Sequence, residues 1–137
     1  ATILATDICS EALGTAMLGI YPESMIGPVP MELRRRYLLR AKKGDRDRFR
    51  MAPELRRTIR FGRLNLMQAP YAVDRDMDAI FCRNMLIYFD KPTQQTVLEQ
   101  LCHHLRPGGF LFLGHSETLT GMGLPVDPVG STVFRRR

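Results

Sequence analysis

The sequence predicts an α/β fold with a mainly parallel sheet, and two observations support this class. Apolar strands near residues 78–82 and 110–113 enclose a helix, an order that is typical of parallel strands joined by a crossover. Polar residues follow both strands, at 82–84 and at 115–117. In an open parallel sheet these polar residues project at the carboxyl edge, where such folds bind ligands.

Size and composition indicate one soluble globular domain. The chain has 137 residues, of which 45% are hydrophobic and 25% charged, enough to bury a core. No apolar run approaches the roughly 20 residues that cross a bilayer, and no signal-peptide pattern opens the chain, so we expect a cytoplasmic protein without membrane insertion. The sequence begins on a strand-like run without an initiator Met, which predicts a fragment whose true start lies upstream.

The first elements are a strand and a helix. The run 3–6 predicts a short buried strand ending at Asp7, and Ser10 is expected to cap the helix that follows. Gly19 suits the helix C-terminus. The apolar positions of this helix recur on one face: Ala12, Leu13, Ala16 and Met17.

Residues 20–62 interrupt the alternation of strands and helices. Four prolines and many charges mark this stretch, with a helix expected at 31–39 and strand character at 49–51 and 58–61. We interpret it as a small inserted subdomain with antiparallel strands. The run 58–64 then continues as a strand of the main sheet.

The second half contains the main core. A strand is expected at 77–82, and Asp90 is expected to cap a helix that carries Pro92 in its first turn. Residues 106–109 are expected to stop this helix and turn the chain into the next strand, and the tail to form a hairpin whose last strand pairs antiparallel at the sheet edge. The helix carries an apolar stripe: Val97, Leu98, Leu101, Cys102 and Leu105.

The net charge of +6 comes from one window. Residues 34–63 hold 11 of the 17 arginines and two of the three lysines, Lys42 and Lys43. This window is either a solvated basic face or a surface for an acidic partner such as a peptide, a phosphate or a nucleic acid. Few aromatic residues interleave the charges, so a stacking platform for single-stranded nucleic acid is weakly supported.

Cysteines and histidines predict no metal site. Cys9, Cys82 and Cys102 are odd in number and lack Cys-x-x-Cys spacing, so we expect buried thiols rather than disulfides or zinc ligands. His103 and His104 have no partner at metal-ligand spacing and are expected to be solvated on the polar side of their helix.

Polar residues after the strands are the candidate binding residues. Asp7 could accept hydrogen bonds from a ribose diol or cap a helix, and Asn65 could bind an adenine edge or occupy a turn. Arg83 and Asn84 face a ligand cleft or make a surface ion pair. The run 115–117 is not read as a hydrolase triad, because the chain has no Gly-x-Ser-x-Gly elbow.

Taken together, these segments resemble the chemotaxis-receptor glutamate methyltransferases of the CheR type. The run from Phe81 to Asp90 is the most specific part of a match that is collinear over essentially the whole chain. The other matching segments lie at 5–8, 19–21, 36–37, 63–66, 105–109 and 114–117.

The resemblance implies a class I S-adenosylmethionine-dependent methyltransferase sheet, Rossmann-like and truncated at its N-terminal side, with 20–62 as an inserted β-subdomain. It implies that Asp7 holds the cofactor ribose, that Asn65 and Leu66 contact the adenine, and that Arg83 and Asn84 line the cofactor and substrate site. Both Arg83 and Tyr88 are candidate substrate-site residues, whereas no catalytic residue is assigned with certainty.

The implied partners are the cytoplasmic helices of bacterial chemoreceptors and, in some members, a receptor C-terminal peptide. Candidate peptide-docking residues are Arg46, Arg48 and Arg50. The family's Gly-rich first strand and its N-terminal helical domain are absent from this sequence, so the chain alone is expected to bind S-adenosylmethionine or the product S-adenosylhomocysteine weakly, to be inactive, and to be prone to self-association through exposed strand edges.

Two other functions stay open. One is a receptor-peptide docking module without catalysis of its own. The other is a nucleic-acid methyltransferase of the same fold, which the basic window favours. The Asn/Asp-Pro-Pro-Tyr type of sequence expected for base amino groups is missing, however, and Arg83–Leu86 stands in its place. We therefore expect no stable nucleic-acid complex.

Overall fold

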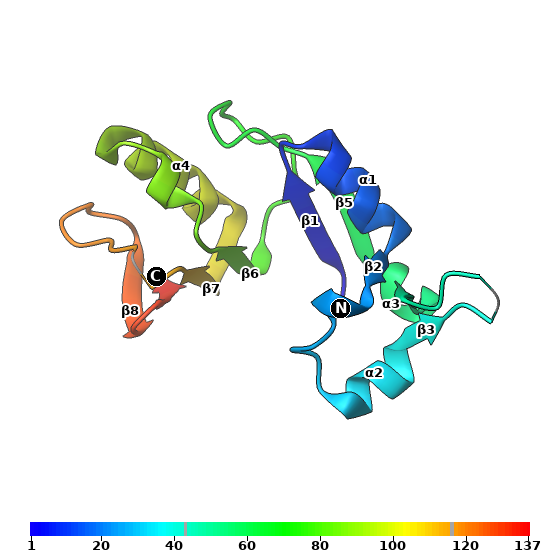
Figure 1. Ribbon diagram of the computed structural model, residues 1–137. Coiled ribbons are helices and arrows are strands. Elements are labelled where there is room, and N and C mark those ends of the chain that lie inside the picture. The colour runs from blue at the N-terminus through cyan, green and yellow to red at the C-terminus, as the bar shows by residue number, and fades with distance from the viewer. Residues whose placement is uncertain (43, 116) are drawn as a thin grey trace. The chain divides into compact units, whose positions relative to one another are not determined.

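The computed structural model describes residues 1–42, 44–115 and 117–137, which form two compact units (Figure 1). The first unit spans Ala1–Asn65 and the second Leu66–Arg137. Both combine helices with sheets, so the mixed α/β class is confirmed. Within the described residues, no helix has the length and apolar character needed to cross a membrane.

A parallel strand pair and a helix make up one part of the first unit. β1 (Ile3–Asp7) pairs in parallel with β5 (Ile59–Arg63), and α1 (Ser10–Leu18) contacts both strands (Figure 1). Gly19 adopts φ 64° and ends α1 as predicted, because glycine enters the left-handed region without a steric penalty. The prediction that Ser10 caps this helix was wrong. The N-cap is Cys9, whose Sγ accepts a hydrogen bond from Ala12 N at 3.5 Å.

The other part of the first unit is a three-stranded antiparallel sheet. Its strand order is β2 (Ile20–Pro22), β4 (Arg48–Met51) and β3 (Leu38–Arg40). The expected helix at 31–39 ends at Tyr37, because Leu38 already pairs with Met51. Short helices complete the region: η1 (Glu23–Met25), α2 (Met31–Tyr37) and α3 (Pro53–Arg56).

The second unit is a four-stranded sheet with one long helix. β6 (Met77–Cys82) and β7 (Leu105–Leu113) are parallel and are joined through η2 (Leu86–Tyr88) and α4 (Lys91–His104) (Figure 1). Asp90 caps α4 as predicted, its Oδ1 accepting from Thr93 N at 3.0 Å. Residues 106–109 belong to β7 rather than to a turn, because strand structure begins directly at Leu105.

The end of the chain forms the predicted hairpin with a different strand order. β8 (Val126–Gly130) and β9 (Val133–Arg136) are antiparallel, and the sheet runs β6-β7-β9-β8. The last strand therefore lies inside the sheet, and β8 is the edge. Pro128 on β8 fits this order, since proline has no N–H to donate and is found in edge strands rather than inner ones.

The core of the second unit lies between α4 and one face of the sheet. All five residues of the predicted apolar stripe are buried, as are Leu111 and Leu113 of β7. Burying each of the leucine and valine side chains in this set contributes roughly 1.5–3 kcal/mol. On β7 the residues alternate, so that Phe110 is exposed while Leu111 is fully buried.

His104 belongs to this core, and the prediction that it is solvated was wrong. It is only 4% exposed, stacks on Tyr71 with 5.9 Å between ring centroids, and its Nδ1 lies 2.9 Å from the carbonyl oxygen of Asp74. Its place at the last turn of α4 gives no sign of this burial in sequence, because the covering segment comes from residues 71–74. His103 is exposed as expected.

Candidate functional site

Arg83 and Asn84 stand at the carboxyl end of β6, where the sequence predicts binding residues. Both are exposed, directly after the buried Cys82. Asn84 adopts φ 59°, a left-handed conformation that asparagine tolerates better than most residues. The chain therefore turns sharply at the end of the strand, and the turn presents both side chains to solvent at this edge.

Gly114 and Glu117 pack against this turn from the end of β7. A Cβ built on Gly114 would lie 2.6 Å from Oδ1 of Asn84 and 2.9 Å from Oε2 of Glu117. Glu117 is 8% exposed, and its carboxylate accepts two backbone hydrogen bonds, from Leu86 N at 2.9 Å and from Gly114 N at 2.5 Å. One side chain thus joins the segments that follow two parallel strands.

The segment between Asn84 and α4 is also tied to the helix. Gln94 Nε2 donates to the carbonyl oxygens of Leu86 and Phe89, both at 2.9 Å. Hydrogen bonds from Thr93 lower the pKa of the Asp90 carboxyl. Tyr88, a predicted substrate-site residue in this segment, is 76% exposed.

Burial favours the neutral forms of the Cys82 thiol and the Tyr71 phenol. Burial, and secondarily the charge of Glu117, raises the pKa of Cys82 to about 11. Burial and then Cys82 raise the pKa of Tyr71 to about 12. Since a thiolate is the reactive form, Cys82 is unsuited to act as a nucleophile at neutral pH.

Asp7 lies beside a small cavity in the first unit. Its Oδ1 accepts a hydrogen bond from Cys9 N at 2.8 Å, and Cys9 rather than Asp7 is the helix N-cap. The carboxylate is exposed, which suits a hydrogen-bond acceptor for a diol. The cavity has a volume of about 150 Å³ and is lined by β1, β5 and α1 residues: Ala5, Thr6, Asp7, Ala12, Leu13, Ala16 and Phe61.

Asn65 and Leu66 follow β5 closely. The strand pairing of β1 and β5 continues past their ends, since Leu64 N donates to Asp7 O at 3.0 Å. Asn65 is therefore one residue beyond this bond and is half-buried. Leu66 begins the second unit, where Tyr71 Oη donates to its carbonyl oxygen at 2.8 Å.

The three candidate docking arginines fall into two environments. Arg48 and Arg50 share the exposed face of β4, whereas the intervening Phe49 faces the other side. Arg48 pairs with Asp45 at 3.2 Å, and Arg50 Nε donates to Leu18 O at 3.2 Å. Arg46 precedes the strand and donates to Lys42 O at 3.2 Å.

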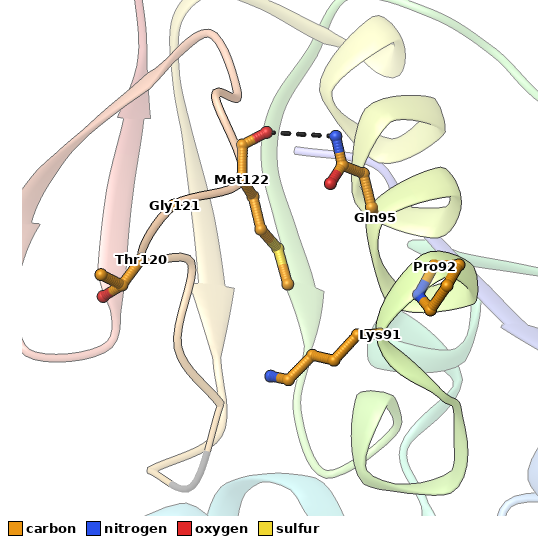
Figure 2. Close-up of a pocket in the computed structure, with 6 residues that line it drawn as sticks. All are labelled: Lys91, Pro92, Gln95, Thr120, Gly121 and Met122. Carbon is orange, nitrogen blue, oxygen red and sulfur yellow. Dashed lines mark hydrogen bonds between the residues drawn. The ribbon is translucent and has the colours of Figure 1, made fainter.

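A second pocket, which the sequence did not reveal, opens beside the N-terminus of α4 (Figure 2). Its volume is about 560 Å³. Lys91 and Gln95 project from α4 toward the loop that carries Met122, and Gln95 Nε2 donates to Met122 O at 3.2 Å. The lining residues are Lys91, Pro92, Gln95, Thr120, Gly121 and Met122. The residues from α4 and those from the loop are 25 or more positions apart in sequence, so no local pattern predicts the pocket.

Predicted site residues therefore fall into two groups, Asp7 and Asn65 in the first unit and Leu66, Arg83 and Asn84 in the second. Ser116 and Lys43 lie outside the described residues. Among the residues that are described, no cluster of His, Cys, Asp and Glu is arranged to hold a metal ion. Of the three cysteines, Cys82 and Cys102 are buried as predicted, whereas Cys9 is exposed.

Comparison with known proteins identifies relatives over nearly the whole chain. Residues 1–134 match the family model of the CheR methyltransferase, SAM binding domain. The chain is 40% identical over 132 residues to chemotaxis protein methyltransferase 2 of Pseudomonas aeruginosa, covering 96% of this chain and 47% of that protein. Chemotaxis protein methyltransferases of Klebsiella aerogenes and Escherichia coli are 39% and 36% identical, each with 96% of this chain and 46% of the relative covered. The chain thus spans about half the length of these curated relatives.

Proposed function

Because the chain belongs to the family of the CheR methyltransferase SAM-binding domain, we propose that it is the C-terminal part of an enzyme that methylates glutamate side chains of bacterial chemoreceptors. The observation that carries this proposal is the segment after β6. There Arg83 and Asn84 are presented to solvent by a turn that Gly114 and Glu117 support from the neighbouring parallel strand. Carboxyl edges of parallel strands are where folds of this class bind ligands.

The residues suit a methyl transfer that relies on positioning. When bound, S-adenosylmethionine supplies an activated methyl group on a sulfonium. The receptor glutamate, with an ordinary pKa near 4.3, is ionised at neutral pH and needs alignment rather than a strong general base. Arg83 suits this task, since a guanidinium binds a carboxylate through two parallel hydrogen bonds. Tyr88, which is exposed in the same segment after β6, would border the incoming side chain.

Cofactor binding is assigned by residue chemistry. The exposed carboxylate of Asp7 would accept hydrogen bonds from the ribose diol, and the Asn65 amide can both donate to and accept from an adenine edge. Leu66 would contact the ring, and its backbone is held by Tyr71. Asn84 would supply a further polar contact to the cofactor. These donors and acceptors fit the nucleoside without a metal ion.

The pocket beside α4 is the proposed place for the receptor segment around the methylated glutamate. It is lined by the start of α4, the helix that follows β6 and η2, and by the loop that follows β7. Lys91 gives it a positive charge, while Pro92 and Met122 offer apolar contact. An acidic helix with intermittent apolar residues fits this lining.

The decisive experiment is methyl transfer by the full-length protein from labelled S-adenosylmethionine to a purified chemoreceptor cytoplasmic domain. We expect label that mild base releases as methanol, because carboxyl methyl esters hydrolyse under conditions that leave N-methyl groups intact. RNA and DNA serve as alternative substrates in the same assay. Base-stable label in nucleic acid, or no transfer to receptor, would overturn the proposal.

A docking role for the antiparallel sheet is a second proposal, and it does not exclude the first. The exposed guanidinium groups of Arg48 and Arg50 on one face of β4 support it. A pull-down with an acidic receptor-tail peptide, comparing the wild type with Arg46, Arg48 and Arg50 replaced, tests it.

A further inference from the structure

We propose that Glu117 is a positioning residue that fixes the turn carrying Arg83 and Asn84 through its hydrogen bonds to the Leu86 and Gly114 amides. This inference rests on the proposed function of that turn. Glu117 itself is buried and contacts backbone groups, so it acts through its neighbours.

Two hydrogen bonds connect the Glu117 side chain to the segments that follow β6 and β7. Leu86 follows Asn84 by two residues, and its N–H donates to Oε1 of Glu117 at 2.9 Å. The N–H of Gly114, at the end of β7, donates to Oε2 at 2.5 Å. Charge-assisted bonds of this kind are shorter and stronger than bonds between neutral groups. The carboxylate therefore holds two segments that are 28 residues apart in sequence at a fixed separation.

Because Gly114 packs closely against Asn84, the position of Asn84 depends on the distance between these two segments. Gly114 leaves no room for a Cβ, which would lie 2.6 Å from Asn84 Oδ1 and 3.1 Å from Asn84 N. The left-handed backbone of Asn84 also needs support from its surroundings, since φ of 59° is sparsely populated. A shift of Gly114 or Leu86 would thus move Asn84, and Arg83 beside it.

Isosteric replacement separates positioning from packing. Glu117→Gln keeps the shape of the side chain but turns one acceptor into an NH₂ donor, which then faces a backbone N–H. Glu117→Asp keeps both acceptors but is one methylene shorter, so it cannot reach both amides. Glu54→Gln, an exposed glutamate on α3, is the matched control.

The test combines amide hydrogen exchange with cofactor binding and kinetics, all on the full-length protein. For Glu117→Gln we expect exchange at Leu86 or Gly114 to accelerate by about tenfold or more, with the amides of Leu111 and Phe112 unchanged. We also expect weaker S-adenosylhomocysteine binding and a fall in kcat on the order of 10- to 100-fold, with little change in the receptor KM. Glu117→Asp should behave similarly, and Glu54→Gln like the wild type.

Unchanged exchange at both amides would overturn the inference, as would faster exchange with unaltered cofactor binding and kcat. If Glu117→Gln fails to fold, Gly114→Ala replaces it, because its Cβ would lie 2.6 Å from Asn84 Oδ1 and 2.9 Å from Glu117 Oε2 and so crowds both the turn and the carboxylate that supports it. Normal binding and kcat in that variant would also overturn the inference. A wild type that neither binds S-adenosylhomocysteine nor transfers a methyl group refutes the proposed function, whereas the exchange data still show whether Glu117 fixes the turn.

Discussion

Gly114 lies against Asn84 so closely that no side chain fits between them. A Cβ at position 114 would come within 2.6 Å of Asn84 Oδ1, far inside an ordinary contact. Gly114→Ala therefore has to displace Asn84, and we expect the free energy of unfolding to fall by about 1–3 kcal/mol, the usual cost of overpacking. Urea unfolding followed by circular dichroism measures this change.

Gly14 provides the matched control within the same chain. It lies in the exposed middle of α1, and a Cβ there would meet no atom within 4 Å. Gly14→Ala is expected to stabilise the protein by roughly 0.5–1 kcal/mol, because alanine loses less conformational entropy in a helix. Equal stability of Gly114→Ala and the wild type would contradict the close packing at the site.

The buried thiols should make stability fall at alkaline pH. Burial raises the pKa of both Cys82 and Cys102 from 9.0 to about 11. The unfolded chain ionises first, so these groups contribute stability that is intact below pH 9 and is lost as the pH rises toward 11. Urea midpoints at pH 8, 9.5 and 10.5 test this dependence.

Single cysteine variants show which thiol causes the loss of stability at alkaline pH. Cys82→Ala should be less stable at pH 8 but lose less stability between pH 9 and 11, because one ionising group has been removed. Cys9 is exposed, so Cys9→Ser is the control for removing a cysteine outside the core. An identical slope in Cys82→Ala would show that its thiol does not titrate differently in the folded state.

Local signals explain what could be predicted from sequence. The strand Met77–Cys82 and the cap at Asp90 depend on neighbouring residues alone, and the structure confirms both. The same holds for Gly19 at the end of α1. Arg83 and Asn84 were placed correctly at a strand end because an apolar run stops directly before them.

Long-range contacts explain the rest. The sequence places Glu117 in a polar run after a strand and in a segment of the family resemblance, but assigns it no role. Its partners, Leu86 and Gly114, are set by strand pairing rather than by sequence spacing. His104 looked solvated by helical periodicity, yet a preceding loop brings Tyr71 onto it. The strand order of the final hairpin likewise depends on which strand pairs with β7.

Arg48 is the docking candidate that can be tested with the least structural disturbance. Its ion pair with Asp45 is exposed, and such pairs contribute only about 0–1 kcal/mol to stability. We expect Arg48→Ala to weaken binding of an acidic receptor-tail peptide about three- to tenfold, with a smaller salt dependence of the affinity. Calorimetry at two ionic strengths measures both quantities.

The control for Arg48 is Arg137→Ala. Arg137 is an exposed arginine of the second unit and pairs with Asp127 of the same unit. This variant should leave peptide affinity unchanged. Equal losses in both variants would indicate a general effect of net charge rather than a docking face on β4.

Lys91 supplies the positive charge of the pocket beside α4. Reversing that charge should weaken binding of the receptor but not binding of the cofactor. Its Nζ is 3.3 Å from Gln94 Oε1, and no carboxylate pairs with it among the ion pairs of the described residues. We expect Lys91→Glu to raise the receptor KM about tenfold, because an acidic helix would meet a like charge, while S-adenosylhomocysteine affinity stays unchanged. Lys91→Arg keeps the charge and should keep the KM. Methyl-transfer kinetics over a range of receptor concentrations measures the effect, and an unchanged KM for Lys91→Glu would place the receptor segment elsewhere.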